Sequence, residues 1–105
     1  PSIPWMQQLL VEDNIKIEQW ENYQKQGLTN RCKILGANGI ITLSVPLIGG
    51  REQKTCIKDV RINHTENWPI KHLRTIRSCY GKAPFFEYYF NPIHEILFKK
   101  NIYLL

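Results

Sequence analysis

The chain lacks the features that mark several common classes of protein. It has no apolar run near the roughly 20 residues that a membrane-spanning helix needs. Its first residues carry neither the basic segment nor the cleavage site of a secretory signal peptide. It also has no internal repeat and no low-complexity segment. These absences predict a folded, cytoplasmic protein with no membrane span.

Cysteine and histidine are too few and too scattered for a disulfide framework or a metal site. The three cysteines are an odd number without a C-x-x-C pair, and the histidines at positions 64, 72 and 94 form no paired ligand motif. Cys32 and Cys79 lie beside basic residues that lower a thiol pKa, but inert thiols in or near the core are the better interpretation. We therefore expect no metal, no cofactor and reduced cysteines.

Charge is the most informative part of the composition. The chain has 14 Lys and Arg residues against 9 Asp and Glu residues, a net charge of +5. Two stretches, 22–38 and 67–86, are basic and contain no acid. Clustering of this kind attracts phosphates, carboxylates or acidic partners. A solvated basic surface without a ligand is the alternative interpretation.

Turn signals and alternation predict a small sheet. Strand-like residues at 31–35 and 40–45 flank an Asn-Gly pair at 38–39, which is a strong signal for a β-hairpin. Apolar and polar residues also alternate at 15–18, and a further short strand is expected at 57–62. These four strands predict a small mixed sheet.

Three segments carry helix signals. A short helix is expected near 5–10 and a longer one over 69–80, with Gly81 as a left-handed stop. An aromatic-rich helix is expected after Pro84, with another turn or two from Pro92. We expect a single α/β domain, with α+β as the alternative class, in which two to three helices pack on the sheet.

The loop before the hairpin and the helix over 69–80 carry the residues from which we predict an anion-binding site. Arginine binds phosphate and carboxylate groups through a planar fork, lysine adds a point charge, and amides and phenols add neutral hydrogen bonds. The predicted ligand-binding residues are Asn22, Tyr23, Lys25, Asn30, Arg31, Lys71, Arg74, Tyr80 and Lys82.

Each part of this predicted site has a structural alternative. If the helix faces the loop, His72 is the candidate catalytic base, because imidazole titrates near neutral pH. A lone helical histidine is more often packed or solvent-facing. In the loop, Asn30 and Arg31 have the alternative role of capping the hairpin and pairing with Glu18 or Glu21.

Two separated motifs resemble the WbqC-like family of bacteria. The first comprises Asn22-Tyr23-Gln24-Lys25-Gln26, Asn30-Arg31-Cys32-Lys33-Ile34, the Gly-Ala-Asn-Gly turn and Leu43-Ser44-Val45-Pro46. The second comprises Trp68, Lys71-His72-Leu73-Arg74 and Tyr80-Gly81-Lys82-Ala83-Pro84-Phe85-Phe86. The resemblance covers nearly the whole chain and implies a role in bacterial surface polysaccharide biosynthesis, notably O-antigen assembly. Family members extend beyond both ends, so we expect a central fragment of a longer chain.

Two classes of function remain open. One is a sugar-modifying transferase, or its substrate-binding part, that holds an activated sugar or acyl donor such as a nucleotide sugar. The other is a nucleic-acid or acidic-partner binding module, because aromatic residues near the basic stretches can stack on bases. The apolar ends of the chain additionally predict a homodimer.

Overall fold

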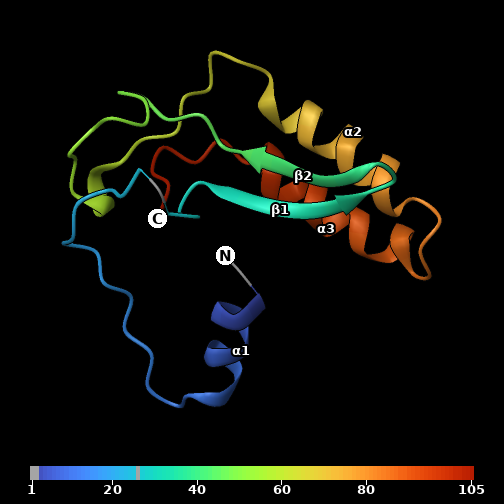
Figure 1. The fold of residues 1–105 in the computed structure, drawn as a ribbon, viewed down its shortest axis with the longest axis horizontal. Helices are drawn as coiled ribbons and strands as arrows, with labels where there is room; N and C mark the ends of the chain where they lie inside the picture. The colour runs from blue at the N-terminus through green and yellow to red at the C-terminus, as the bar shows by residue number, and fades with distance from the viewer. Residues whose placement is uncertain (1–2, 26) are drawn as a thin grey trace.

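The computed structural model describes residues 3–25 and 27–105. In chain order its elements are α1 (Ile3–Val11), β1 (Arg31–Gly36), β2 (Gly39–Ser44), the short 3-10 helix η1 (Ile57–Asp59), α2 (Trp68–Tyr80) and α3 (Phe86–Phe98). The β1–β2 hairpin lies beside α2 and α3, long irregular segments occupy the other end, and an extended segment leads to α1 (Figure 1). The small α/β fold predicted from the sequence is confirmed.

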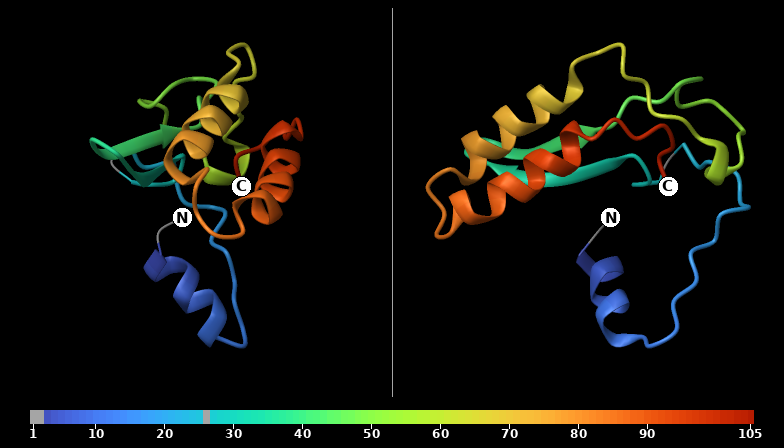
Figure 2. Two further views of the ribbon diagram at one scale, coloured as in Figure 1. Left: turned by 90° about the vertical axis from the view of Figure 1, so that its right-hand side faces the viewer. Right: turned by 180° about the vertical axis from the view of Figure 1, so that it is seen from behind.

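The hairpin is the predicted one. β1 and β2 pair antiparallel, with Arg31 opposite Ser44 at the open end and Gly36 opposite Gly39 at the turn. Gly39 has φ 126°, a conformation that a residue with a Cβ rarely adopts. Both α2 and α3 lie on the same side of this hairpin (Figure 2).

α2 confirms the helix predicted over 69–80, but its end differs from the prediction. The helix buries Trp68, His72 and Leu73, which form one stripe. Gly81 has φ −57° and is right-handed, so its predicted role as a left-handed stop is wrong. The left-handed residue is Phe85, with φ 61°, and α3 begins directly after it.

α3 is one continuous helix rather than two pieces. Pro92 lies inside it, where it removes one backbone donor without ending the helix. The buried ring of Phe86 packs against Phe90, with ring centroids 5.1 Å apart. The Arg77 guanidinium of α2 lies 4.4 Å from the Phe90 ring centroid, so cation–π contacts help to hold α3 against α2.

The strand predicted over 15–18 is wrong. That segment has no regular secondary structure, and Ile15 and Ile17 are 46% and 56% exposed. Alternation marks a strand only when a neighbouring strand and a core lie within reach, and this segment has neither. α1, which precedes it, buries none of its nine residues, all of which the structure describes.

The strand predicted over 57–62 is also wrong. The segment begins with η1 and then pairs through two isolated bridges, Leu47 with Ile62 and Arg61 with Tyr103. Within the described residues the sheet is therefore the two-stranded hairpin, not a four-stranded mixed sheet.

The core lies around η1. Val60 is fully buried and clusters with buried Tyr23, Leu47 and Ile57, against which Leu104 packs. Backbone hydrogen bonds fasten the same segments together, since Leu104 N–H donates to the Val60 carbonyl oxygen at 2.9 Å. Nowhere in residues 3–25 and 27–105 is a helix both long and apolar enough to cross a membrane.

Gly39→Ala tests the turn of the hairpin. No atom lies within 4 Å of a Cβ built at Gly39, so the cost comes from the backbone conformation alone. We expect the free energy of unfolding to fall by about 1–3 kcal/mol in urea denaturation. Gly50→Ala is the matched comparison, because Gly50 also has open space but its φ of 72° is nearer the left-handed helical region. A larger loss for Gly50→Ala than for Gly39→Ala would contradict this account.

Candidate anion-binding site

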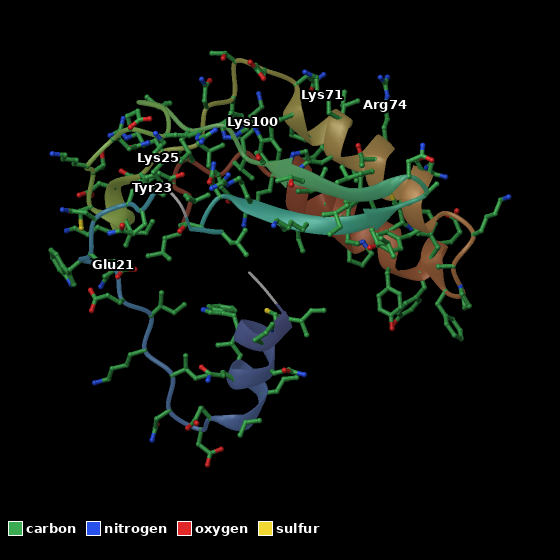
Figure 3. The ribbon with its side chains drawn as sticks, in the orientation of Figure 1. Glu21, Tyr23, Lys25, Lys71, Arg74 and Lys100 are labelled. Atoms are coloured by element: carbon green, nitrogen blue, oxygen red, sulfur yellow. The ribbon has the colours of Figure 1, made fainter. Side chains whose placement is uncertain are left out.

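Two of the predicted ligand-binding residues are built into the interior. The Tyr23 hydroxyl donates to Asn30 Oδ1 at 2.9 Å, and Asn30 Nδ2 donates to the Val45 carbonyl oxygen at 2.9 Å. Both side chains are buried. Tyr23 and Lys25 lie in the irregular part of the body, which is the chain after residue 22, and away from α2 (Figure 3). Tyr23 and Asn30 therefore fix the loop from 22 to 31 against the hairpin.

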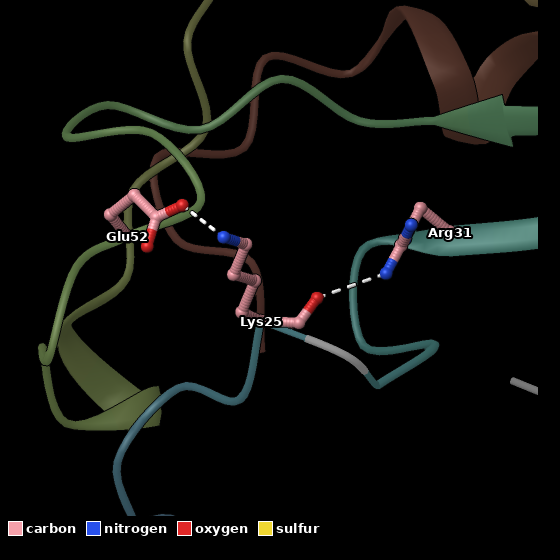
Figure 4. A network of polar contacts seen from close by, with 3 residues as sticks. All are labelled: Lys25, Arg31 and Glu52. Atoms are coloured by element: carbon pink, nitrogen blue, oxygen red, sulfur yellow. Dashed lines mark hydrogen bonds and ion pairs between the residues drawn. The ribbon is translucent and has the colours of Figure 1, made fainter.

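Arg31 holds the same loop from the start of β1. Its Nη2 donates to the carbonyl oxygens of Lys25 at 3.0 Å and Gly27 at 3.1 Å, the first of which is drawn in Figure 4. A guanidinium has five N–H donors, and these two bonds come from one nitrogen. Arg31 thus places the backbone of Lys25 at the end of the hairpin.

Lys25 joins this loop to the next one. Its ammonium group forms an ion pair with Glu52, in the loop that follows Leu47 (Figure 4). The hydrogen bond from Lys25, and then its charge, lower the pKa of the Glu52 carboxyl below its usual value. The two side chains are 48% and 77% exposed, and exposed pairs of this kind stabilise proteins little.

His72 contacts the hairpin rather than the loop. Its Nε2 lies 3.0 Å from the Ser44 carbonyl oxygen, and because a carbonyl only accepts, Nε2 carries the proton and donates. Burial lowers the pKa of His72, and the hydrogen bond to Ser44 opposes that effect. The Trp68 ring packs edge-on against the imidazole, with ring centroids 5.1 Å apart.

The remaining predicted residues lie elsewhere. Lys71 and Arg74 are exposed, and Figure 3 shows them pointing away from the body, well separated from Lys25. Tyr80 is the last residue of α2, about 14 Å along the helix from Lys71 at 1.5 Å per residue. Lys82 follows the end of the helix. Asn22 is exposed and pairs with Cys56 through an isolated bridge.

Six of the predicted residues therefore fall into two groups, a loop cluster and a separate helix surface formed by Lys71 and Arg74, and the others lie outside both. The loop cluster comprises Tyr23, Lys25, Asn30 and Arg31, with Glu52 as a partner that the sequence did not indicate. A cavity of roughly 720 Å³ lies between α1 and the body, and none of the predicted residues lines it. The described residues contain no group of side chains suited to a metal ion, and all three cysteines are free and half-buried.

Comparison with known proteins identifies one family. The model of the WbqC-like protein family matches residues 1–105, which is the whole chain. No curated protein and no solved structure matches the sequence.

Tyr23→Phe tests whether the loop depends on its buried hydrogen bond. Removing the hydroxyl leaves Asn30 Oδ1 buried without that donor, so the free energy of unfolding should fall by about 1–3 kcal/mol. Tyr88→Phe is the matched control, because that side chain is 74% exposed, and it should unfold like the wild type in urea. Equal stability of the two variants would show that the Tyr23 hydroxyl does not hold the loop.

The lowered pKa of His72 predicts loss of stability in acid. The unfolded chain takes up a proton near pH 6.5, whereas the folded imidazole resists protonation until a lower pH. The free energy of unfolding should therefore fall as the pH drops through about 6.5, and urea denaturation at several pH values measures it. His72→Gln keeps a donor for Ser44 and should flatten this dependence. His94→Gln, at an exposed position on α3, should leave the pH dependence unchanged. If His94→Gln flattened it and His72→Gln did not, His72 would not be its source.

Proposed function

Because the chain belongs to the WbqC-like protein family, we propose that it takes part in bacterial surface polysaccharide biosynthesis by binding the anionic group of an activated sugar or acyl donor. The binding site is the loop cluster, with Lys25 and Arg31 as its cations. The observation that most directly supports this proposal is the Glu52 carboxylate on the Lys25 ammonium group at the surface. A phosphate of the donor takes the same position.

The Lys25–Glu52 pair is one that a ligand can displace. Both side chains are largely exposed, so water and salt screen their attraction. A pyrophosphate carries more charge than one carboxylate and offers more acceptor oxygens. When Glu52 leaves, Arg51 beside it adds a further cation to the same loop. Ligand binding therefore exchanges a weak internal ion pair for stronger charge-assisted hydrogen bonds.

Arg31 has two roles in this proposal. Its Nη2 holds the carbonyl oxygens of Lys25 and Gly27, which keeps the lysine at the mouth of the loop. Its other N–H groups are the donors that suit a second phosphate oxygen. Arg31→Ala alone is a poor test, since it removes the loop's support together with the charge.

A second candidate function rests on the helix surface. Lys71 and Arg74 are three residues apart on α2, both exposed, and point away from the body (Figure 3). A surface of this kind suits nucleic-acid phosphates or an acidic partner. Tyr80 and Lys82 are not part of this surface, because nine residues of helix place Tyr80 on the opposite face of α2 from Lys71 and Lys82 follows the end of the helix. The assignment of His72 as a catalytic base stays a prediction; Nδ1 is its proton-accepting nitrogen while Nε2 donates to Ser44.

Isothermal titration calorimetry with a nucleotide sugar and, separately, with inorganic pyrophosphate tests the loop site. Wild-type protein should bind saturably, and Lys25→Ala should weaken binding about tenfold or more, because a charge-assisted hydrogen bond is lost. Glu52→Gln should tighten binding, since it removes the competing carboxylate. Lys54→Ala, an exposed lysine in the same loop as Glu52, is the matched control and should bind like the wild type.

The same titrations distinguish the two candidate functions. Absence of binding by the wild type to every anionic donor tried would exclude the loop site. Affinity for oligonucleotides that falls steeply with salt, and that Lys71→Ala with Arg74→Ala removes while Lys25→Ala does not, would favour the helix surface instead.

A further inference from the structure

The chain divides into an acidic arm, residues 3–22, and a basic body, residues 23–25 and 27–105. The first 22 residues contain four acids (Glu12, Asp13, Glu18 and Glu21) against one lysine, a net charge of −3. The rest of the chain contains 13 basic and 5 acidic residues, a net charge of +8, which together with the arm gives the +5 of the whole chain. The arm and the body are thus strongly complementary in charge.

α1, at the start of the arm, has the composition of a buried helix, yet none of its residues is buried. Its sequence, IPWMQQLLV, is apolar on nearly every side, and a helix apolar all round is normally buried. Yet Ile3, Leu10 and Val11 are 76%, 87% and 78% exposed. A nine-residue helix is also too short to be stable by itself in water. The side of α1 formed by Ile3, Leu10 and Val11 therefore has no packing surface in its own copy, whereas Leu9 and Trp5 line the cavity between α1 and the body.

α3 carries an exposed apolar stripe of matching kind. Tyr88, Pro92 and Ile96 follow one another at a spacing of four residues, which places them on one face. All three are exposed, with Tyr88 at 74% and Ile96 at 67%. The stripe ends at Lys99 and Lys100, both exposed. It is an apolar surface with two cations at one end.

We propose that α1 of one copy packs along the α3 stripe of a second copy, and that the exchange is reciprocal. The nine residues of α1 span about 14 Å, close to the length of α3 from Tyr88 to Ile96. When the two helices run parallel, Glu12 and Asp13, directly after α1, meet Lys99 and Lys100. Reciprocal exchange about a two-fold axis makes the contact twice and closes the assembly as a dimer.

Charge favours packing of the arm on a body over packing of two arms on each other. Two arms packed on each other would bring together two net charges of −3, whereas an arm on the body pairs −3 with +8. The segment over 15–19 has no regular secondary structure and separates α1 from the body (Figure 1), as expected of an arm that reaches a neighbouring copy. This inference is independent of the anionic ligand proposed for the loop cluster.

Sedimentation analysis over a concentration series tests the exchange. The wild type should pass from monomer to dimer as concentration rises. Leu10→Ala and Ile96→Ala should each raise the dissociation constant of the dimer about tenfold or more, as buried interface side chains do. Leu35→Ala is the matched control, because this leucine is 68% exposed at the tip of the hairpin, and it should dimerise like the wild type. Circular dichroism checks that each variant keeps its helices.

Charge reversal tests the direction of packing. Glu12→Lys with Asp13→Lys should weaken the dimer, as should Lys99→Glu with Lys100→Glu, and the four changes combined in one chain should restore it. A chain that stays monomeric throughout the concentration series overturns the proposal. If hydrogen exchange then shows that the amides of α1 are protected, α1 packs on its own body instead. A dimer indifferent to Leu10→Ala, or four reversals that fail to restore association, overturns it as well.

Discussion

The rest of the body depends on the packing of apolar side chains around buried Val60. Tyr23, Leu47 and Ile57 meet around it from segments far apart in the chain, with Leu104 against them. Only eight apolar side chains are buried among the described residues, and each fully buried one contributes about 1.5–3 kcal/mol. Because Tyr23 belongs both to this cluster and to the hydrogen bond with Asn30, the core also determines where the loop cluster lies.

The loop cluster is held by a neutral hydrogen bond inside and by the guanidinium of Arg31, while the Lys25 ammonium group remains at the surface. Tyr23 and Asn30 hydrogen-bond within the interior, while one nitrogen of Arg31 donates hydrogen bonds to two backbone carbonyl oxygens. Lys25 is consequently fixed at its backbone but half-exposed at its side chain. A cation so placed stays in contact with water, so the desolvation cost of a buried charge is avoided. This arrangement leaves the Lys25 ammonium group accessible but adds little to the stability of the fold.

Local signals in the sequence predicted most of the local structure, apart from the left-handed stop at Gly81 and the helix break at Pro92, and the larger failures occurred where a distant partner decides. The Asn-Gly pair at 38–39 determines its own turn, and the apolar stripe of α2 is visible within a few turns of helix. Alternation at 15–18 and 57–62 could not reveal that no neighbouring strand extends the sheet there. Likewise, Glu52 lies 27 residues from Lys25, and nothing near either residue indicates the pair. The basic loop was predictable, but its internal carboxylate was not.

The separation of charge between arm and body bears on both proposals, although neither depends on the other. Glu18 and Glu21 belong to the arm but lie near its junction with the body, where the Glu21 carbonyl oxygen accepts from Ile57 N–H and Trp20 lies against Lys58. These contacts fasten residues 19–22 of the arm to the body. Screening at physiological salt limits the effect of the arm's acids to about 8 Å. If α1 packs on a second copy as proposed above, its acids act on Lys25 only where they come this close, and added salt weakens that effect.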